Sequence, residues 1–313
     1  MSAIIKSKPN LAITIRSIDN KNSNYKLLEN YFDVSYINET GRRLSENEVI
    51  NAIAKADAVL AGTEQFNKKV LESTDSLKVI SRVGVGLDNI DLNVASERNI
   101  VVLNTPNAPT QAVAEHTTAL ILTIYKNIIT YNSEIKGNYQ KNTSGRLLSG
   151  KTAGVIGLGR IGFTVANLLS AFNCNINFYD PYVQDKQIPE NWTRYASVNE
   201  LVQNSDIITL HMPPKSDNTP ILDSECFNQV KRGSILINTA RSSLIDERAL
   251  LNALDRGIIS GAGLDVYDNI IEDQIQNYPQ IILTPHVASN TKESRYEMEA
   301  EAINNLIKAI MEN

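Results

Sequence analysis

Short runs of apolar and β-branched residues alternate along this chain with stretches in which apolar residues recur at helical spacing. The apolar runs predict strands over residues 11–15, 34–37, 58–61, 79–83, 101–103, 153–156, 176–179, 207–210, 235–237, 261–264 and 281–283. The stretches between them predict helices, for example over residues 46–55, 163–172, 199–203 and 248–254. Because strands that alternate with helices form βαβ units, the pattern indicates an α/β fold built on parallel sheets.

The predicted strands fall into two blocks, which indicate two doubly wound parallel-sheet domains. Residues 112–131, between the blocks, have a helical pattern, and the polar residues 132–149 are predicted to be a connection. A last helix over residues 292–312 follows the final strand, and its apolar side chains would let it pack back onto the first domain. We therefore expect one domain to combine residues 1–104 with 291–313 and the other to span residues 105–290.

Composition narrows the class of protein. A chain of 313 residues has room for two domains of roughly 100–200 residues each. The net charge of −5 argues against the basic face that a nucleic-acid-binding protein needs. The longest apolar run, around residues 119–125, is far shorter than the ~20 residues of a membrane span. The N-terminus also lacks the apolar stretch of a signal peptide. We expect a soluble cytoplasmic protein that binds neither nucleic acid nor membrane.

No metal site is expected from the cysteines and histidines. Cys174 and Cys226 do not form a C-x-x-C motif, and they are interpreted as buried thiols of a reducing compartment. His116, His211 and His286 are too far apart in the sequence to show a zinc-ligand spacing.

A glycine motif follows the predicted strand at residues 153–156. Gly157, Gly159 and Gly162 form G-x-G-x-x-G, and a predicted helix comes directly after them. The first glycine allows a tight turn, the second lets the backbone approach a pyrophosphate, and the third lets helix and strand pack closely. The helix N-terminus offers N–H groups to the phosphates. The motif predicts a Rossmann-type dinucleotide site.

An acidic residue at the end of the next strand selects the dinucleotide. Asp180 follows Gly162 by 18 residues, close to the spacing of about 20 that the motif requires. A carboxylate at this point accepts hydrogen bonds from the ribose hydroxyls and repels a 2′-phosphate. The expected cofactor is therefore NAD and not NADP.

Three later strands are each followed by polar residues, among them His211, Arg241 and His286. Ligands of open α/β sheets bind at the carboxyl ends of the strands. Arg241 and His286 are therefore expected at the place where chemistry occurs.

These motifs together resemble the D-isomer-specific 2-hydroxyacid dehydrogenase family, which includes phosphoglycerate, glycerate, formate and D-lactate dehydrogenases. Residues 81–91 are similar to the family's substrate loop, and residues 113–116 to the start of its interdomain helix. The glycine loop and residues 238–241, 261–266 and 284–286 complete the set in the family's order. The resemblance implies a Rossmann NAD-binding domain and a flavodoxin-like substrate domain. It also implies an NAD-dependent oxidoreductase that acts on the CH–OH group of a 2-hydroxy acid.

The resemblance also implies roles for individual residues. Arg241 would hold the substrate carboxylate in its planar fork, and His286 would exchange a proton with the substrate oxygen. The implied cofactor contacts are Gly157, Gly159, Arg160, Ile161, Gly162, Asp180, Pro181, His211, Met212, Pro213, Thr239, Ala240, Asp265 and Ala288. The implied substrate contacts are Val83, Gly84, Val85, Gly86 and Asn107, with a plain turn or loop as the alternative. His116 is interpreted as a structural histidine.

The sequence departs from the family's pattern at the third catalytic position. The family's glutamate lies five positions after the aspartate that matches Asp265, and Ile270 stands there in this chain. Either Glu272, or else Asp268, takes over the role, or the role is vacant. If it is vacant, carbonyl reduction is expected to fall off at a lower pH than in relatives that have the glutamate.

The sequence leaves the identity of the substrate and the oligomeric state open. The loop at residues 61–66 has no arginine to match the one that binds phosphate in phosphoglycerate dehydrogenases, so a 3-phosphoglycerate-like substrate is one alternative among 2-oxo and 2-hydroxy acids. No regulatory domain is expected after residue 313. Family members are usually homodimers, so we expect one here. The rival hypothesis is an NAD-binding regulatory protein, similar to a corepressor, with weak or no catalysis.

Overall fold

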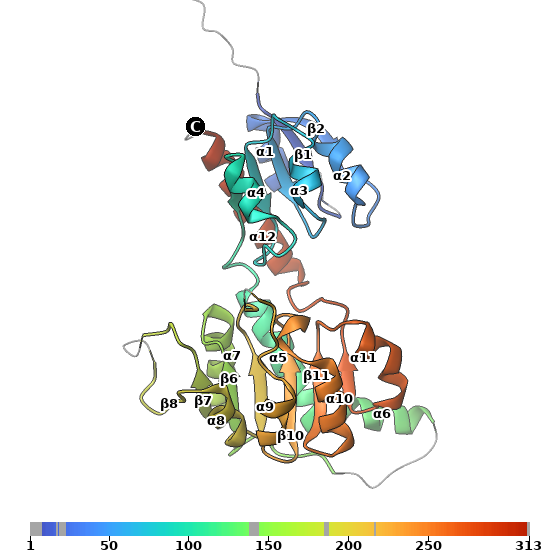
Figure 1. The fold of residues 1–313 in the computed structure, drawn as a ribbon, viewed down its shortest axis with the longest axis vertical. Coiled ribbons are helices and arrows are strands. Elements are labelled where there is room, and N and C mark those ends of the chain that lie inside the picture. Colours follow the sequence, from blue (N-terminus) through green and yellow to red (C-terminus); the bar gives the residue numbers. More distant parts are fainter. Residues whose placement is uncertain are drawn as a thin grey trace, which may run out of the picture. The chain divides into compact units, whose positions relative to one another are not determined.

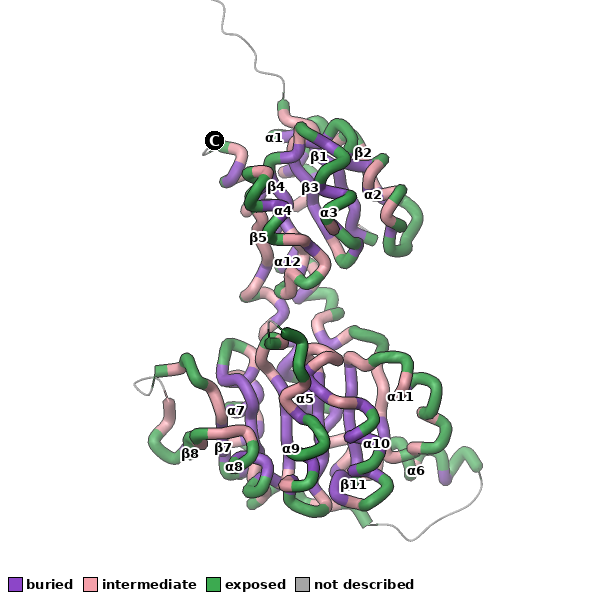
Figure 2. Tube along the Cα trace, in the orientation of Figure 1, coloured by how far each residue is buried: buried purple, intermediate pink, exposed green. Residues whose placement is uncertain are grey.

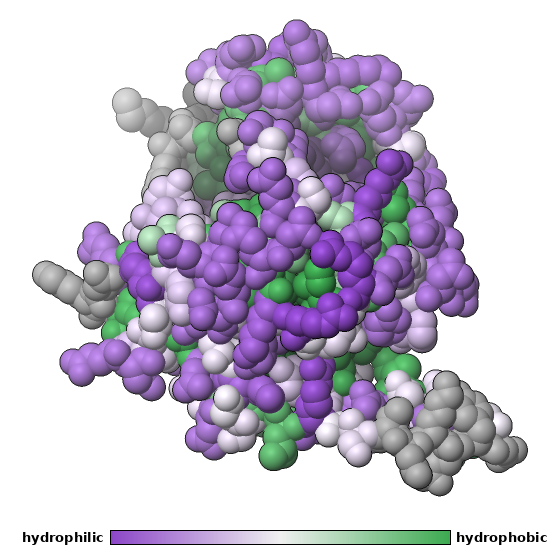
Figure 3. Space-filling model, turned by 60° about the horizontal axis from the view of Figure 1, so that its bottom comes forward, coloured by the Kyte–Doolittle hydropathy of each residue, from purple (hydrophilic) through white to green (hydrophobic). Residues whose placement is uncertain are grey.

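A computed structural model describes residues 8–16, 18, 23–137, 144–184, 188–215 and 217–311. The chain divides into two compact units, Met1–Pro109 with Lys292–Asn313 and Thr110–Thr291. Each unit is an α/β domain built on one parallel sheet (Figure 1). Among the described residues, no helix is both long and apolar enough to cross a membrane. The face drawn in Figure 3 is mostly hydrophilic, with smaller areas of hydrophobic side chains.

The first unit contains a five-stranded sheet in the order β2-β1-β3-β4-β5, which is the flavodoxin-like order. Its strands are β1 (Asn10–Ile13), β2 (Asp33–Ile37), β3 (Ala58–Ala61), β4 (Val79–Arg82) and β5 (Val101–Leu103). Its helices are α1 (Ser23–Tyr31), α2 (Glu46–Ile53), α3 (Lys68–Leu71), α4 (Leu92–Glu97) and α12 (Lys292–Met311).

Helices cover both faces of this sheet. Side chains of α2, α3 and α4 form one core with it. On the other face, Ile303 and Leu306 of α12 are fully buried against Leu11 and Ile13 of β1, together with α1. Buried residues therefore concentrate in the inner strands β1, β3 and β4, whereas the edge strands β2 and β5 are partly exposed (Figure 2).

The second unit contains a seven-stranded sheet in the order β12-β11-β10-β9-β6-β7-β8. Its strands are β6 (Thr152–Ile156), β7 (Asn175–Tyr179), β8 (Thr193–Arg194), β9 (Ile207–Leu210), β10 (Ser234–Asn238), β11 (Ile259–Leu264) and β12 (Ile281–Leu283). Its helices are α5 (Thr110–Tyr125), α6 (Ile128–Lys136), α7 (Arg160–Ala171), α8 (Val198–Gln203), α9 (Ser224–Gln229), α10 (Glu247–Asp255) and α11 (Asn269–Gln274), with short 3₁₀ turns at Ser242–Leu244 and Ile275–Asn277. This is the doubly wound Rossmann arrangement, so the predicted fold class is confirmed.

Two local predictions are wrong. The helix expected over residues 112–131 is interrupted after Tyr125, because Asn127 adopts a left-handed conformation with φ of 51°. Asparagine tolerates that conformation better than most residues do. The chain then returns to helix as α6, so residues 132–136 are helical and not part of a connection. Residues 138–143 of the expected connection lie outside the described residues. The two-residue strand β8 was not predicted, because two residues are too short to show a strand pattern.

Candidate active site

The glycine loop joins β6 to α7. Gly157 has a φ of 91°, which glycine adopts without strain, and its N–H donates to the carbonyl oxygen of Tyr179 at 2.8 Å. Gly159 is the N-cap of α7, and Arg160 and Ile161 form the first helical positions. The loop therefore turns sharply out of the sheet and presents the N-terminus of a twelve-residue helix.

The three glycines of the loop differ in the space around them. A Cβ atom on Gly157 would lie 2.7 Å from the His211 carbonyl oxygen, and one on Gly162 would lie 2.0 Å from the Gly157 carbonyl oxygen. At Gly159, by contrast, no atom lies within 4 Å of the Cβ position. Gly157 and Gly162 are thus required by packing, whereas Gly159 leaves open space at the helix N-terminus, where a pyrophosphate would bind.

Asp180 stands at the end of β7 against this loop. Its Oδ2 accepts the N–H of Leu158 at 2.7 Å. Its Oδ1 accepts the N–H groups of Tyr182 at 2.8 Å and Val183 at 3.1 Å. These bonds hold the partly exposed carboxylate beside the glycine loop, and the neighbouring Pro181 is exposed. The contact of Asp180 to the ribose hydroxyls stays a prediction.

His211 follows β9 and packs against the same loop. Its Nε2 lies 2.8 Å from the hydroxyl oxygen of Thr209, and burial lowers the pKa of His211 to about 3. The imidazole is therefore neutral near pH 7 and adds no charge to the nucleotide site. Met212 and Pro213 continue from it away from the strand.

The turn that carries Arg241 is held by a buried asparagine at the end of β10. Asn238 donates from Nδ2 to the carbonyl oxygen of Arg241 at 2.7 Å, and its Oδ1 accepts the N–H of Ala240 at 3.0 Å. The hydroxyl oxygens of Thr239 and Thr117 are 2.9 Å apart. Asn238 was not predicted as a site residue, although a fully buried amide at a strand end signals this kind of support.

Asp265 fastens the turn that carries His286. Its carboxylate accepts the hydroxyl of Thr284 at 2.5 Å and the N–H groups of Val287 and Ala288 at 2.9 Å each. The N–H of His286 donates to the carbonyl oxygen of Asp265 at 3.0 Å. These bonds hold His286 in a left-handed conformation with φ of 55°. Asp265 is 1% exposed, and its observed hydrogen bonds serve the turn.

His116 takes part in the same network from α5. Its Nε2 lies 3.0 Å from the Thr284 hydroxyl oxygen and 3.7 Å from Oδ1 of Asp265. This placement agrees with the structural role that the sequence analysis favoured for His116.

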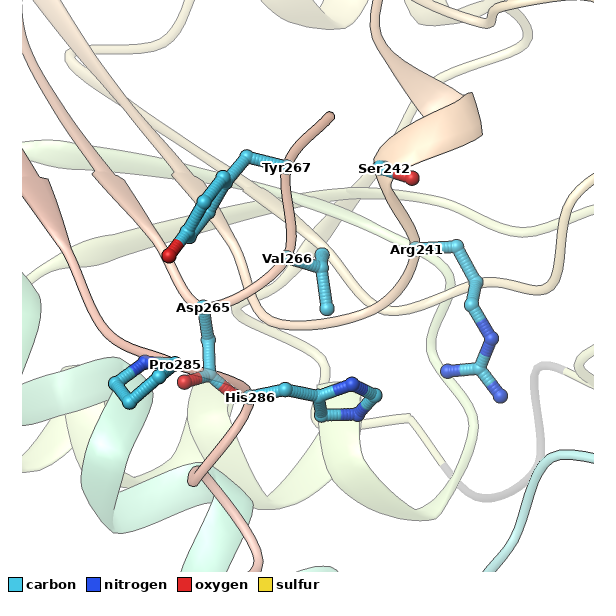
Figure 4. Close-up of a pocket in the computed structure, with 7 residues that line it drawn as sticks. All are labelled: Arg241, Ser242, Asp265, Val266, Tyr267, Pro285 and His286. Atoms are coloured by element: carbon cyan, nitrogen blue, oxygen red, sulfur yellow. The ribbon is translucent and has the colours of Figure 1, made fainter. Parts of the chain in front are cut away.

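The second unit brings Arg241 and His286 to one pocket of about 270 Å³ at the carboxyl ends of its strands. In Figure 4 the guanidinium of Arg241 and the imidazole of His286 extend toward the same part of the pocket. Five further residues line the pocket. Asp265 was expected to contact the cofactor, and the other four were not expected at the site: Ser242, Val266, Tyr267 and Pro285. The pocket therefore holds a guanidinium, which can bind a carboxylate, and an imidazole, which can exchange a proton.

The two carboxylates considered as partners of His286 do not line this pocket. Glu272 is exposed on α11, and Asp268 is exposed just before that helix. Glu247 of α10 is buried and accepts the N–H of Asp268 at 2.6 Å and that of Ile271 at 3.1 Å. Burial raises its pKa. Glu247 thus caps α11, and Asp265 is the carboxylate among the seven lining residues.

The predicted substrate contacts lie in the first unit, after β4. The N–H of Val83 donates to the carbonyl oxygen of Ala61 at 2.8 Å. Gly84 has a φ of 132°, and its N–H donates to the Thr105 hydroxyl at 2.7 Å. Asn107 donates from Nδ2 to Glu301 at 3.3 Å. Residues 83–86 therefore form a loop at the carboxyl edge of the first sheet.

Comparison with known proteins gives consistent matches. A family model described as "D-isomer specific 2-hydroxyacid dehydrogenase, NAD binding domain" matches residues 118–288. D-3-phosphoglycerate dehydrogenase of Archaeoglobus fulgidus is 34% identical over 276 residues, covering 85% of this chain and 52% of the relative. The chain thus spans about half the length of this curated relative.

Solved structures match over nearly the whole chain. The TT0316 protein from Thermus thermophilus has a TM-score of 0.86 and 29% identity, covering 97% of each chain. An acyclic imino acid reductase solved with NADPH and D-Arg has a TM-score of 0.87 and 27% identity, also covering 97% of each chain.

Proposed function

Because the chain belongs to the D-isomer-specific 2-hydroxyacid dehydrogenase family, we propose that it is an NAD-dependent oxidoreductase that interconverts a 2-hydroxy acid and the corresponding 2-oxo acid. The observation that carries this proposal is the pocket that Arg241 and His286 share at the carboxyl ends of the strands of the NAD-binding unit. Ligands of this fold bind at that edge of the sheet.

The two side chains divide the work on the substrate. Bound NADH supplies the hydride that reduces the substrate carbon. Arg241 binds the carboxylate next to that carbon, because a guanidinium matches a carboxylate in a planar, bidentate fashion. His286 gives a proton to the carbonyl oxygen as the 2-oxo acid becomes the 2-hydroxy acid, and it takes the proton back in the reverse direction. The loop at residues 83–86 is proposed to bind the substrate carboxylate through the N–H groups of Val85 and Gly86, since those of Val83 and Gly84 donate within the first unit.

Oxidation of NADH with a panel of 2-oxo acids, including a phosphorylated one, tests this function. We expect His286→Asn to lower kcat by about 10²- to 10⁴-fold, the usual contribution of general acid–base catalysis. Arg241→Lys should lower kcat/KM by about 10- to 100-fold, because the bidentate, charge-assisted contact is lost. Glu272→Gln is the matched control and should keep nearly full activity, because Glu272 is exposed and outside the pocket lining.

The same panel distinguishes this function from the rival one. Tight NADH binding without turnover of any acid would favour an NAD-binding regulatory protein. A large loss of activity in Glu272→Gln would show that Glu272 acts on His286 after all.

We also propose that the enzyme is a cytoplasmic homodimer. Both cysteines are buried thiols outside any disulfide, which suits a reducing compartment. Ile128, Ile129 and Ile135 of α6 are 51%, 48% and 78% exposed, and an apolar helix surface of this kind is typical of an interface between subunits. A solution mass of a single chain would contradict the dimer.

A further inference from the structure

A carboxylate is buried at the carboxyl edge of the first sheet, outside the catalytic pocket. Glu64 lies in the loop after β3 and is 1% exposed. Its Oε1 accepts the N–H of Gly62 at 2.8 Å and the hydroxyl of Thr14, which follows β1. Thr14 is itself fully buried. The carboxylate therefore joins the ends of two neighbouring strands.

This position is the switch point of the sheet. The strand order is β2-β1-β3-β4-β5, so the chain proceeds to one side from β1 and to the other side from β3. In open α/β sheets a crevice forms outside the carboxyl ends of two such strands, and ligands bind in it. Thr14 and Glu64 stand on the two sides of that point.

The Glu64 carboxyl group has hydrogen-bond partners but no basic partner among the described residues. Among the described residues, no lysine, arginine or histidine forms an ion pair with Glu64. The two hydrogen bonds both end on Oε1, which leaves Oε2 able to accept others. Oε2 faces Gly62, where a Cβ atom would lie only 3.0 Å away. A buried polar atom is normally hydrogen-bonded, so Oε2 is a candidate contact for a ligand that carries a donor group.

The loop of Glu64 is tied to the loop proposed to bind the substrate carboxylate. Val83, the first residue of that loop, donates its N–H to Ala61 at 2.8 Å. Asn89, just after the loop, donates from Nδ2 to the carbonyl oxygens of Glu64 at 2.6 Å and Gly62 at 3.3 Å. The loop proposed to bind the substrate carboxylate and the loop of Glu64 are therefore neighbours at the carboxyl edge of the first sheet.

We propose that Glu64 selects a substrate whose side chain ends in an ammonium or guanidinium group, and that Oε2 accepts its hydrogen bond. This inference rests on the proposed function, because it names the substrate class of that activity. The alternative is that Glu64 only closes the turn between residues 62 and 64.

The test compares D-2-hydroxy acids of equal length that end in an ammonium or a methyl group. Their oxidation with NAD is followed by the absorbance of NADH, over a series of chain lengths. At the best length we expect the ammonium acid to exceed the methyl acid in kcat/KM by about 10- to 100-fold, which is the effect of a hydrogen bond to a charged group. Glu64→Gln should bring this ratio near one while the methyl acid is still oxidised.

Two further variants separate selection from a structural role. Glu64→Asp keeps the charge but retracts it by one methylene, so the preferred ammonium acid should become one methylene longer. Loss of stability alone would lower the rates with both acids equally and leave the ratio unchanged. Glu72→Gln is the matched control, because Glu72 is an exposed carboxylate of the same unit.

The proposal is overturned if the wild-type protein does not prefer the ammonium acid, or if the ratio survives Glu64→Gln. If neither acid is oxidised, the proposed dehydrogenase activity is refuted, but the proposal for Glu64 is still testable. Calorimetric titration then measures how tightly the protein binds each of the two acids. A preference for the ammonium acid in binding that Glu64→Gln abolishes would still support the site. Equal binding of the two acids would refute it.

Discussion

His211 and Glu64 show how the fold sets the surroundings of single side chains. Both follow strands of parallel sheets; burial lowers the pKa of His211 to about 3, and Glu64 is 1% exposed. Arg241 and His286 are held differently, by turns whose hydrogen bonds come from Asn238 and Asp265. At this scale the reactive groups depend on a few buried polar neighbours that fix the backbone around them.

The low pKa of His211 predicts a specific loss of stability in acid. In the unfolded chain the imidazole binds a proton below about pH 6.5, whereas in the folded protein it does so only below about pH 3. The unfolded state therefore binds more protons between these values, and the free energy of unfolding falls as the pH falls through that window. The slope for one proton is at most about 1.4 kcal/mol per pH unit.

Urea unfolding of the wild-type protein and His211→Gln at pH 4, 5, 6 and 7 checks this prediction. The variant should lose stability less steeply on acidification, because glutamine carries no titratable proton in either state. Parallel curves for the two proteins would show that His211 does not titrate differently on folding.

The glycine loop is the element that joins sheet, helix and cofactor. The three positions of the loop are occupied by glycine for different reasons. Contacts within the protein require glycine at Gly157 and Gly162, whereas Gly159 leaves open space. The helix α7 begins directly after Gly159, so its N–H groups point to that space. Substitutions in the glycine loop can therefore change either its packing or its ligand site without changing the other.

Gly159→Ala and Gly162→Ala form a matched pair that tests this separation. Gly159→Ala should leave the melting temperature of the protein without cofactor nearly unchanged but weaken NADH binding, because the new methyl group enters the open space. Gly162→Ala should lower the melting temperature by several degrees, since its Cβ would lie 2.0 Å from a backbone oxygen. Calorimetry and NADH fluorescence titration measure the two effects. Equal losses of stability in both variants would contradict the assignment.

At the scale of the whole molecule, α12 completes the first unit although it comes last in the sequence. Ala302, Ile303 and Leu306 are fully buried there, and the hydroxyl of Ser81 donates to the carbonyl oxygen of Ala302 at 2.9 Å. Burial of a side chain such as Ile303 or Leu306 contributes roughly 1.5–3 kcal/mol. The first unit therefore depends on a helix that the chain adds only after the second unit.

A chain that ends at Thr291 should lose the folded first unit and keep the second. The single tryptophan, Trp192, is buried in the second unit and reports on that unit alone. We expect its fluorescence transition to persist, together with NADH binding, while the circular dichroism signal of the first unit is lost. A cooperative loss of both signals would show that the second unit requires the first.

Most of the strands, the fold class and the glycine loop were predictable from the sequence, because each depends on the spacing of neighbouring residues. Apolar runs mark buried strands, and G-x-G-x-x-G with Asp180 marks a dinucleotide site wherever a strand and a helix surround it. The same local reasoning failed at Asn127, where a left-handed residue interrupts a helical pattern, and at β8, which exists only through its pairing with β7.

What the tertiary structure decided is which distant residues meet. It placed Arg241 with His286 in one pocket, left Glu272 outside the pocket lining, and used Asp265 and Asn238 to hold the turns. It also buried Glu64 against Thr14, fifty positions away. The ends of the predicted strands already indicated a common edge for Arg241 and His286, but the supporting contacts of Asp265 and Glu64 form only when separate strands come together in the folded chain.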